Sequence, residues 1–189
     1  MNNTMEAIKK IEVNKVAKII ILALLGTIIL TISAKIKIPF YPVPMTMQTF
    51  VVLLLGMVLG PKIALLTISL YLFQGIFGLP VFAGTPEKGI GFLYFTGPTM
   101  GYLIGFLISS YLAGSFKYDR GLISNFLKLV FSVSFIYISG LIWLGILIGW
   151  DKPIFKLGAQ PFLLAKLFKL ILLTVLYPWI IKINIKLFR

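Results

Sequence analysis

Apolar runs separated by short basic clusters constrain this chain more than any other feature of its sequence. Of its 189 residues, 59% are hydrophobic and 12% are charged, and the mean hydropathy is +1.03. A soluble domain of this length cannot bury so much apolar surface, whereas runs of about 20 apolar residues can cross a bilayer as helices. The sequence therefore predicts an all-α, polytopic membrane protein that forms a single domain over residues 1–189.

Six transmembrane helices are predicted, two of them shorter than the usual ~20 residues. They cover residues 16–33, 46–59, 63–77, 97–114, 122–149 and 162–181, after a cytoplasmic amphipathic lead-in at residues 1–15. Between the first two helices, Pro39, Pro42 and Pro44 predict an extended segment. With both termini inside, 11 of the 18 basic residues fall on the cytoplasmic side and 5 on the outer side. This bias predicts cytoplasmic N and C termini in the plasma (bacterial cytoplasmic) membrane.

The stretch from Gln74 to Phe106 interrupts the helical pattern between the third and fourth predicted helices. Eight Gly and Pro residues lie between Gly78 and Pro98, a density that no helix can continue through. Irregular backbone at membrane depth is tolerated only where it is buried in protein or lines a cavity. We therefore expect a Gly/Pro-rich outward loop that acts as a substrate lid, with an ordinary connector as the alternative.

The composition excludes several classes of function. The chain has no Cys and no His, which removes thiol catalysis, the commonest metal ligand and the commonest general base. All five carboxylates lie outside the predicted helices, so no acidic relay for ion coupling is available, and no P-loop sequence is present to bind ATP. The net charge of +13 lies on membrane flanks and indicates lipid headgroups, not nucleic acid. The sequence thus predicts a non-enzymatic membrane protein without a cofactor or metal, which binds a ligand but cannot drive transport.

Two lysines and one stripe of small residues stand out within the apolar helices. Lys166 and Lys169 share one face of the last helix, where a ligand carboxylate would relieve their charge; snorkelling to the headgroups is the alternative. In the first helix, small side chains recur at a spacing that lets another helix approach closely, although such stripes also occur in ordinary bundles. The members of this stripe are Ala23, Gly26, Thr27 and Thr31.

Four segments carry a resemblance to a known family. They are PFYPVPMTMQTF at Pro39–Phe50, GLPVFAGTPEKGIG at Gly78–Gly91, GPTMGYLIGF at Gly97–Phe106 and PFLLAKLFK at Pro161–Lys169. Together they make the chain similar to the BioY family, the biotin-specific substrate-binding subunits of energy-coupling-factor transporters. The resemblance implies six helices, an outward-facing vitamin pocket capped by loops and no intrinsic ATPase. It also implies a transmembrane coupling subunit, which would dock on the small residues of the first helix, and two ATP-binding subunits.

The resemblance also implies where the ligand is bound. The implied substrate-binding residues are Thr46, Gln48, Phe82, Gly84, Thr85, Gly89, Thr99, Tyr102, Lys166 and Lys169. The sequence departs from the family pattern at Met100, which replaces a Gly, and at Ala165–Lys166, which replaces a Gly–Asp pair. That Asp is expected to accept the ureido N–H groups of biotin, whereas a lysine can only donate.

Three hypotheses follow from these residues. The first is a biotin-binding transporter subunit. The second retains the fold but changes the ligand to another small carboxylate vitamin or acid, because of Lys166. The third is a membrane scaffold without a small ligand.

Overall fold

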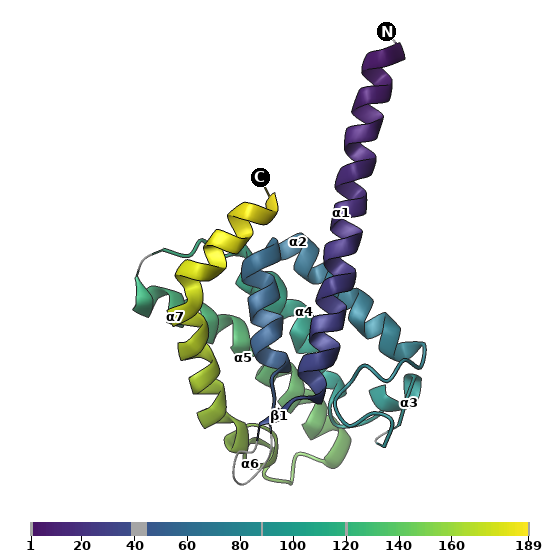
Figure 1. The fold of residues 1–189 in the computed structure, drawn as a ribbon. Helices are drawn as coiled ribbons and strands as arrows, with labels where there is room; N and C mark the ends of the chain where they lie inside the picture. Colours follow the sequence, from purple (N-terminus) through teal and green to yellow (C-terminus); the bar gives the residue numbers. More distant parts are fainter. Residues whose placement is uncertain (1, 39–44, 88, 120, 189) are drawn as a thin grey trace.

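A computed structural model describes residues 2–38, 45–87, 89–119 and 121–188, and it is helical almost throughout (Figure 1). The helices are α1 Asn2–Lys35, α2 Gln48–Ile76, α3 Phe92–Phe95, α4 Met100–Ser115, α5 Leu122–Ile148, α6 Ile154–Gly158, the 3-10 helix η1 Gln160–Phe162 and α7 Leu163–Phe188. Two-residue strands β1 Lys37–Ile38 and β2 Met45–Thr46 pair antiparallel. The predicted all-α membrane fold is confirmed at this level, and the extended proline segment at 39–44 lies outside the described residues.

Helix α2 is bent at a turn near its middle. The sequence pattern predicted two separate helices with this turn between them. Gly60 has a φ of 75° and a ψ of 172°, and Pro61 follows it. Glycine adopts this positive φ without a steric penalty, and a proline starts the next helical turn without losing a needed N–H donor. The ribbon changes direction there, so the predicted helices 46–59 and 63–77 correspond to the two halves of α2 (Figure 1).

Four described segments are long and apolar enough to cross a membrane. They are Val13–Lys35, Gln48–Ile76, Leu122–Ile148 and Ile154–Lys182, and α4 is apolar but has only 16 residues. The fold is therefore that of a multi-pass membrane protein. Because α2 is bent and α4 is short, length and composition alone do not give the predicted number of six spans.

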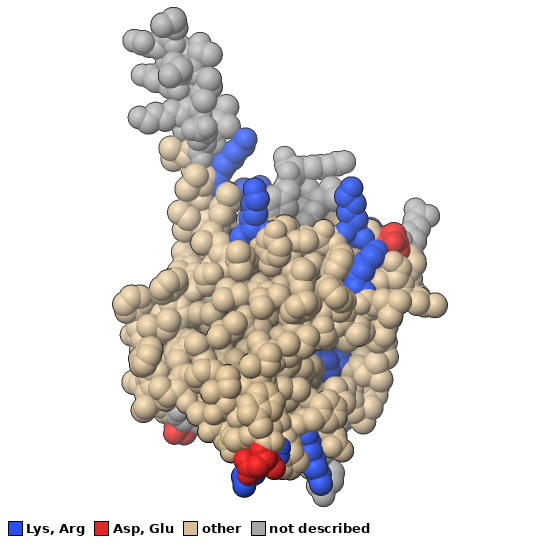
Figure 2. Space-filling view, turned by 180° about the vertical axis from the view of Figure 1, so that it is seen from behind, with Lys and Arg blue, Asp and Glu red and all other residues tan. Residues whose placement is uncertain are grey.

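The surface agrees with a molecule that sits in lipid. Large apolar side chains such as Leu127, Phe131 and Phe168 are more than half exposed. Lys and Arg side chains gather mainly at the two ends of the molecule, with few charged residues on the face between them (Figure 2). The two termini lie at one of these ends, and α3 and α6 lie at the other (Figure 1).

Close helix packing in the centre of the bundle depends on glycines in α2 and α4. A Cβ atom on Gly56 would come within 2.5 Å of the Ser110 carbonyl oxygen, and one on Gly114 within 2.6 Å of the Pro61 nitrogen. The backbones of α2 and α4 therefore touch, as small residues permit between membrane helices. The buried core around this contact includes Leu53, Ile68, Leu103 and other apolar side chains.

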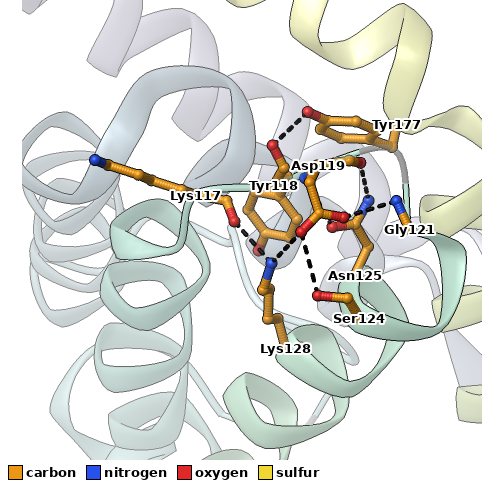
Figure 3. A network of polar contacts seen from close by, with 8 residues as sticks. All are labelled: Lys117, Tyr118, Asp119, Gly121, Ser124, Asn125, Lys128 and Tyr177. Carbon is orange, nitrogen blue, oxygen red and sulfur yellow. Dashed lines mark hydrogen bonds and ion pairs between the residues drawn. The ribbon is translucent and has the colours of Figure 1, made fainter.

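A polar network fastens the end of the molecule that carries the termini (Figure 3). Asp119 precedes α5 and accepts hydrogen bonds from the Gly121 N–H (2.7 Å), the Ser124 hydroxyl (3.3 Å) and Lys128 Nζ (3.1 Å). The Gly121 N–H and Lys128 lower the pKa of the Asp119 carboxyl, since both stabilise its charged form. The fully buried Asn125 amide also donates to the Asp119 carbonyl at 2.7 Å. These bonds satisfy free backbone groups at the start of α5 and fix the preceding loop.

The same loop is tied to α4 and α7. The Tyr118 hydroxyl donates to the Ala113 carbonyl at 2.8 Å, and the Tyr177 hydroxyl donates to the Tyr118 carbonyl at 2.7 Å (Figure 3). Burial raises the pKa of the Tyr118 hydroxyl, which therefore stays protonated and able to donate. The network thus joins α4, α5 and α7, three of the helices that line the cavity described next.

Candidate functional site

A cavity of about 560 Å³ lies between the start of α2, helices α4 and α5, the α6–η1 segment and the first turns of α7. Its volume is within the range of small-molecule sites, about 300–1,000 Å³. Apolar side chains make much of the wall, including Leu103, Phe106, Ile136 and Leu144. A smaller number of polar groups reaches into it, which is the usual composition of a vitamin-sized binding site.

Six of the ten predicted substrate-binding residues line this cavity. They are Thr46, Gln48, Thr99, Tyr102, Lys166 and Lys169. They come from three separate parts of the chain, which the fold brings together. Their contact with a ligand remains a prediction, but their convergence on one cavity supports it.

Both lysines of α7 are buried at the cavity wall. Lys169 is 5% exposed, and its Nζ donates to the Thr46 carbonyl oxygen at 2.6 Å. Lys166 is 6% exposed, and its Nζ lies 4.9 Å from the centroid of the Tyr137 ring. The snorkelling alternative therefore does not describe this structure, because snorkelling would carry the ammonium groups to the headgroups.

The charged side chains at the described wall of the cavity are basic. No Asp or Glu is among its described lining residues. The ion pairs found among the described residues, Lys128–Asp119 and Lys152–Asp151, do not line the cavity. Two buried ammonium groups without a carboxylate partner favour an anionic ligand, since an unpaired buried charge is costly.

Hydrogen bonds hold the other predicted residues at the wall. Gln48 Nε2 donates to the Tyr71 hydroxyl at 2.8 Å, and that hydroxyl donates to the Val81 carbonyl at 2.8 Å. The Thr46 hydroxyl lies 3.3 Å from Gln48 Oε1. These hydrogen bonds fix the start of α2 against the loop that follows α2.

Helix α4 and the α6–η1 segment are joined across the cavity by Tyr102. Its hydroxyl donates to the Gly158 carbonyl at 2.9 Å. Gly158, Tyr137 and Phe162 also line the cavity, although the sequence did not single them out. A tyrosine in an apolar helix carries no signal that distinguishes a pocket wall from the ordinary core, so only the fold could identify Tyr137.

Phe82, Gly84, Thr85 and Gly89 are not among the residues that line the cavity. Phe82 is buried in an aromatic cluster, with ring centroids 5.2 Å from Tyr71 and 4.8 Å from Tyr94. Gly84 and Gly89 have φ angles of 77° and 94°, which glycine permits in a tight loop. In this structure these residues shape the loop between α2 and α4, and a ligand contact by any of them remains a prediction.

Lys35, at the end of α1, secures that loop. Its Nζ donates to the carbonyl oxygens of Phe82 (3.0 Å) and Thr85 (2.8 Å) and to the Thr85 hydroxyl (3.0 Å). The loop also contains the short helix α3, where the sequence indicated irregular chain throughout. Ala83 and Tyr94 of this region line the cavity, so the loop contributes to its wall as a lid would.

The small-residue stripe of α1 is packed inside the molecule. Ala23 and Thr27 are 1% and 2% exposed, and a Cβ on Gly26 would come within 2.5 Å of Thr67 Cγ2 in α2. Thr31 is half-buried. This differs from the expected docking surface, because the close approach that small residues permit is already made by α2. A partner that binds beside the stripe remains a prediction.

Comparison with known proteins places the chain among membrane transporters. The BioY family model matches residues 2–185. A protein of Pyrococcus horikoshii named "Probable biotin transporter BioY" is 37% identical over 81% of this chain and 90% of its own length. "Biotin transporter BioY" of Thermotoga maritima is 33% identical over 79% of this chain and 88% of its own length.

A solved structure agrees with these sequence relatives. The crystal structure of the S-component for biotin from an ECF-type ABC transporter matches with a TM-score of 0.72 and 26% sequence identity. The match covers 89% of this chain and 93% of that chain. The resemblance carried by the four sequence segments therefore extends to the fold.

Proposed function

The chain belongs to the BioY family, and we propose that it is the biotin-binding membrane subunit of an energy-coupling-factor uptake transporter. The observation that carries this assignment is the cavity that brings Lys166 and Lys169 together with residues of three other family-like segments. A cavity with an apolar wall and two buried ammonium groups suits a ligand with an apolar body and a carboxylate. The chain acts as a transporter subunit and not as an enzyme.

The subunit captures biotin from the outside and needs partners to move it. Its sequence has no P-loop, so ATP must be hydrolysed by other chains. We propose a transmembrane coupling subunit and two ATP-binding subunits as those partners, in the bacterial cytoplasmic membrane. Six membrane-spanning helical segments follow if the halves of α2 count separately and α4 also spans.

A ligand titration tests the assignment. Trp143 in α5 donates to the Gly97 carbonyl at 2.9 Å, beside Pro98 and Thr99 of the cavity wall. Biotin binding is therefore expected to change tryptophan fluorescence of the purified protein and to saturate at nanomolar concentration. If fluorescence does not change with biotin but changes with another small acid, the second hypothesis is favoured. In that hypothesis, motivated by Lys166, the fold binds another small carboxylate. No response to any acid would favour a scaffold.

The orientation of the subunit is proposed with both termini in the cytoplasm, from the 11 against 5 basic residues. The wild-type chain has no cysteine, so a single introduced cysteine reports one position. Glu87→Cys, in the exposed loop before α3, is expected to react with an impermeant maleimide in intact cells. Lys62→Cys, exposed beside the turn in α2, is expected to react only after permeabilisation. The opposite labelling pattern would show that the loop before α3 faces the cytoplasm, and it would contradict the proposed orientation.

A further inference from the structure

Lys166 and Lys169 form a pair of cations that the wall of the cavity only partly satisfies. They lie three residues apart on α7, and both line the cavity while they remain 6% and 5% exposed. Like charges three residues apart on one helix face repel each other. Burial of two like charges side by side is unfavourable unless an opposite charge joins them.

The described contacts of the two ammonium groups differ. Lys169 Nζ has a hydrogen bond to the Thr46 carbonyl, which fixes its position with one of its three donors. Lys166 Nζ lies over the face of the Tyr137 ring, which attracts a cation but accepts no strong hydrogen bond. Both groups therefore retain donors that a ligand oxygen can use, and Lys166 retains the larger unused capacity.

Resting on the proposed function, we propose that Lys166 and Lys169 together hold the carboxylate of the ligand, and that Lys166 makes this site selective for the acid over its uncharged ester. A carboxylate offers two oxygens with about four lone-pair positions, enough for both ammonium groups at once. It also removes the repulsion between them, which an ester or an amide of the same ligand cannot do because neither carries a charge.

The ureido ring must then be recognised by other groups. Its N–H donors need acceptors, and a lysine ammonium has none. Thr46 in β2, Gln48 at the start of α2 and Thr99 just before α4 line the cavity and carry side-chain oxygens. Gln48 Nε2 is already bound to Tyr71, which orients the amide and presents its Oε1 toward Thr46.

A comparison of two ligands with two variants tests the pairing. Lys166→Met replaces the ammonium group with an apolar side chain of similar length. Lys156→Met is the matched control, because Lys156 is exposed and does not line the cavity. We expect Lys166→Met to weaken biotin binding by about 30-fold or more, the effect of removing one partner of a buried charge pair. The same variant should change binding of biotin methyl ester by less than about 3-fold, and Lys156→Met should change neither, since an exposed lysine contributes little.

The alternatives give different results. Equal losses for biotin and its ester would show that Lys166 contacts the ureido oxygen or supports the wall, and would overturn the pairing. Unchanged biotin binding, in a variant with wild-type thermal stability, would show that Lys166 does not contact the ligand and would overturn it as well. A wild-type protein that does not bind biotin would instead contradict the proposed function, so the two failures are distinguishable.

Discussion

Replacement of Lys169 with alanine is expected to weaken biotin binding by about 30-fold to several-thousand-fold. The variant leaves the ligand carboxylate without one of its charged partners. Truncation of one member of a buried, hydrogen-bonded charge pair costs on the order of 2–5 kcal/mol, and each 1.4 kcal/mol is about tenfold in affinity. Lys169 is 5% exposed at the cavity wall, which is the geometry that this magnitude requires.

Part of the Lys169 effect will be structural, and the methyl ester of biotin separates it. The variant also removes the 2.6 Å hydrogen bond to the Thr46 carbonyl, which fixes the entry into α2. This loss weakens biotin and its ester alike, whereas the loss of charge pairing weakens only biotin. Lys182→Ala, an exposed position farther along α7, serves as the control and should leave both ligands unaffected. Losses in Lys169→Ala that are equal for biotin and the ester would refute carboxylate pairing.

The double variant tests whether both lysines serve one anion. If Lys166 and Lys169 hold the same carboxylate, the loss in affinity of the double variant should differ from the sum of the two single losses, because their contacts with one group are coupled. Separate ligand groups would give additive losses. Isothermal titration of biotin into all four proteins, including the wild type, measures this coupling.

The features that the sequence predicted best are those set by local physical chemistry. Helix α5 ends at Ile148, one residue before the predicted limit at Gly149, because an apolar run and a glycine with a φ of 93° define its end. Lys166 and Lys169 were recognisable as candidate site residues because an ammonium group within an apolar membrane helix costs free energy and therefore indicates a functional site.

The features that the sequence left open depend on which surfaces meet. The spacing of Ala23, Gly26 and Thr27 indicated a close helix contact but could not say whether α2 or another protein makes it. Phe82 and Thr85 belong to a segment whose Gly and Pro content indicated a loop, yet its path depends on long-range contacts to Lys35 and Tyr71. Such contacts between distant parts of the chain carry no periodic signal.

A second large effect is expected at the contact between α4 and α5, which positions one wall of the cavity. Gly101 and Gly105 lie one turn apart in α4, and both face α5. A Cβ on Gly105 would come within 2.5 Å of the Ile136 Cα and 3.0 Å of the Phe135 carbonyl oxygen, which are backbone atoms that no rotamer change can move. The glycines therefore allow the two helix backbones to touch.

Gly105→Leu is expected to destabilise the fold by about 3 kcal/mol or more, at or beyond the upper end of overpacking effects, because α5 must move away from α4. Ile136 and Tyr137 line the cavity, so the same movement widens it and should reduce biotin affinity. Gly105→Ala should give a smaller loss of the same kind. The matched control is Ile108→Leu, which introduces the same side chain on the same helix at a position that is 39% exposed. Thermal unfolding of the three variants in detergent, with and without biotin, measures both effects. If Gly105→Leu melted with the control and bound biotin normally, the close contact between α4 and α5 would be refuted.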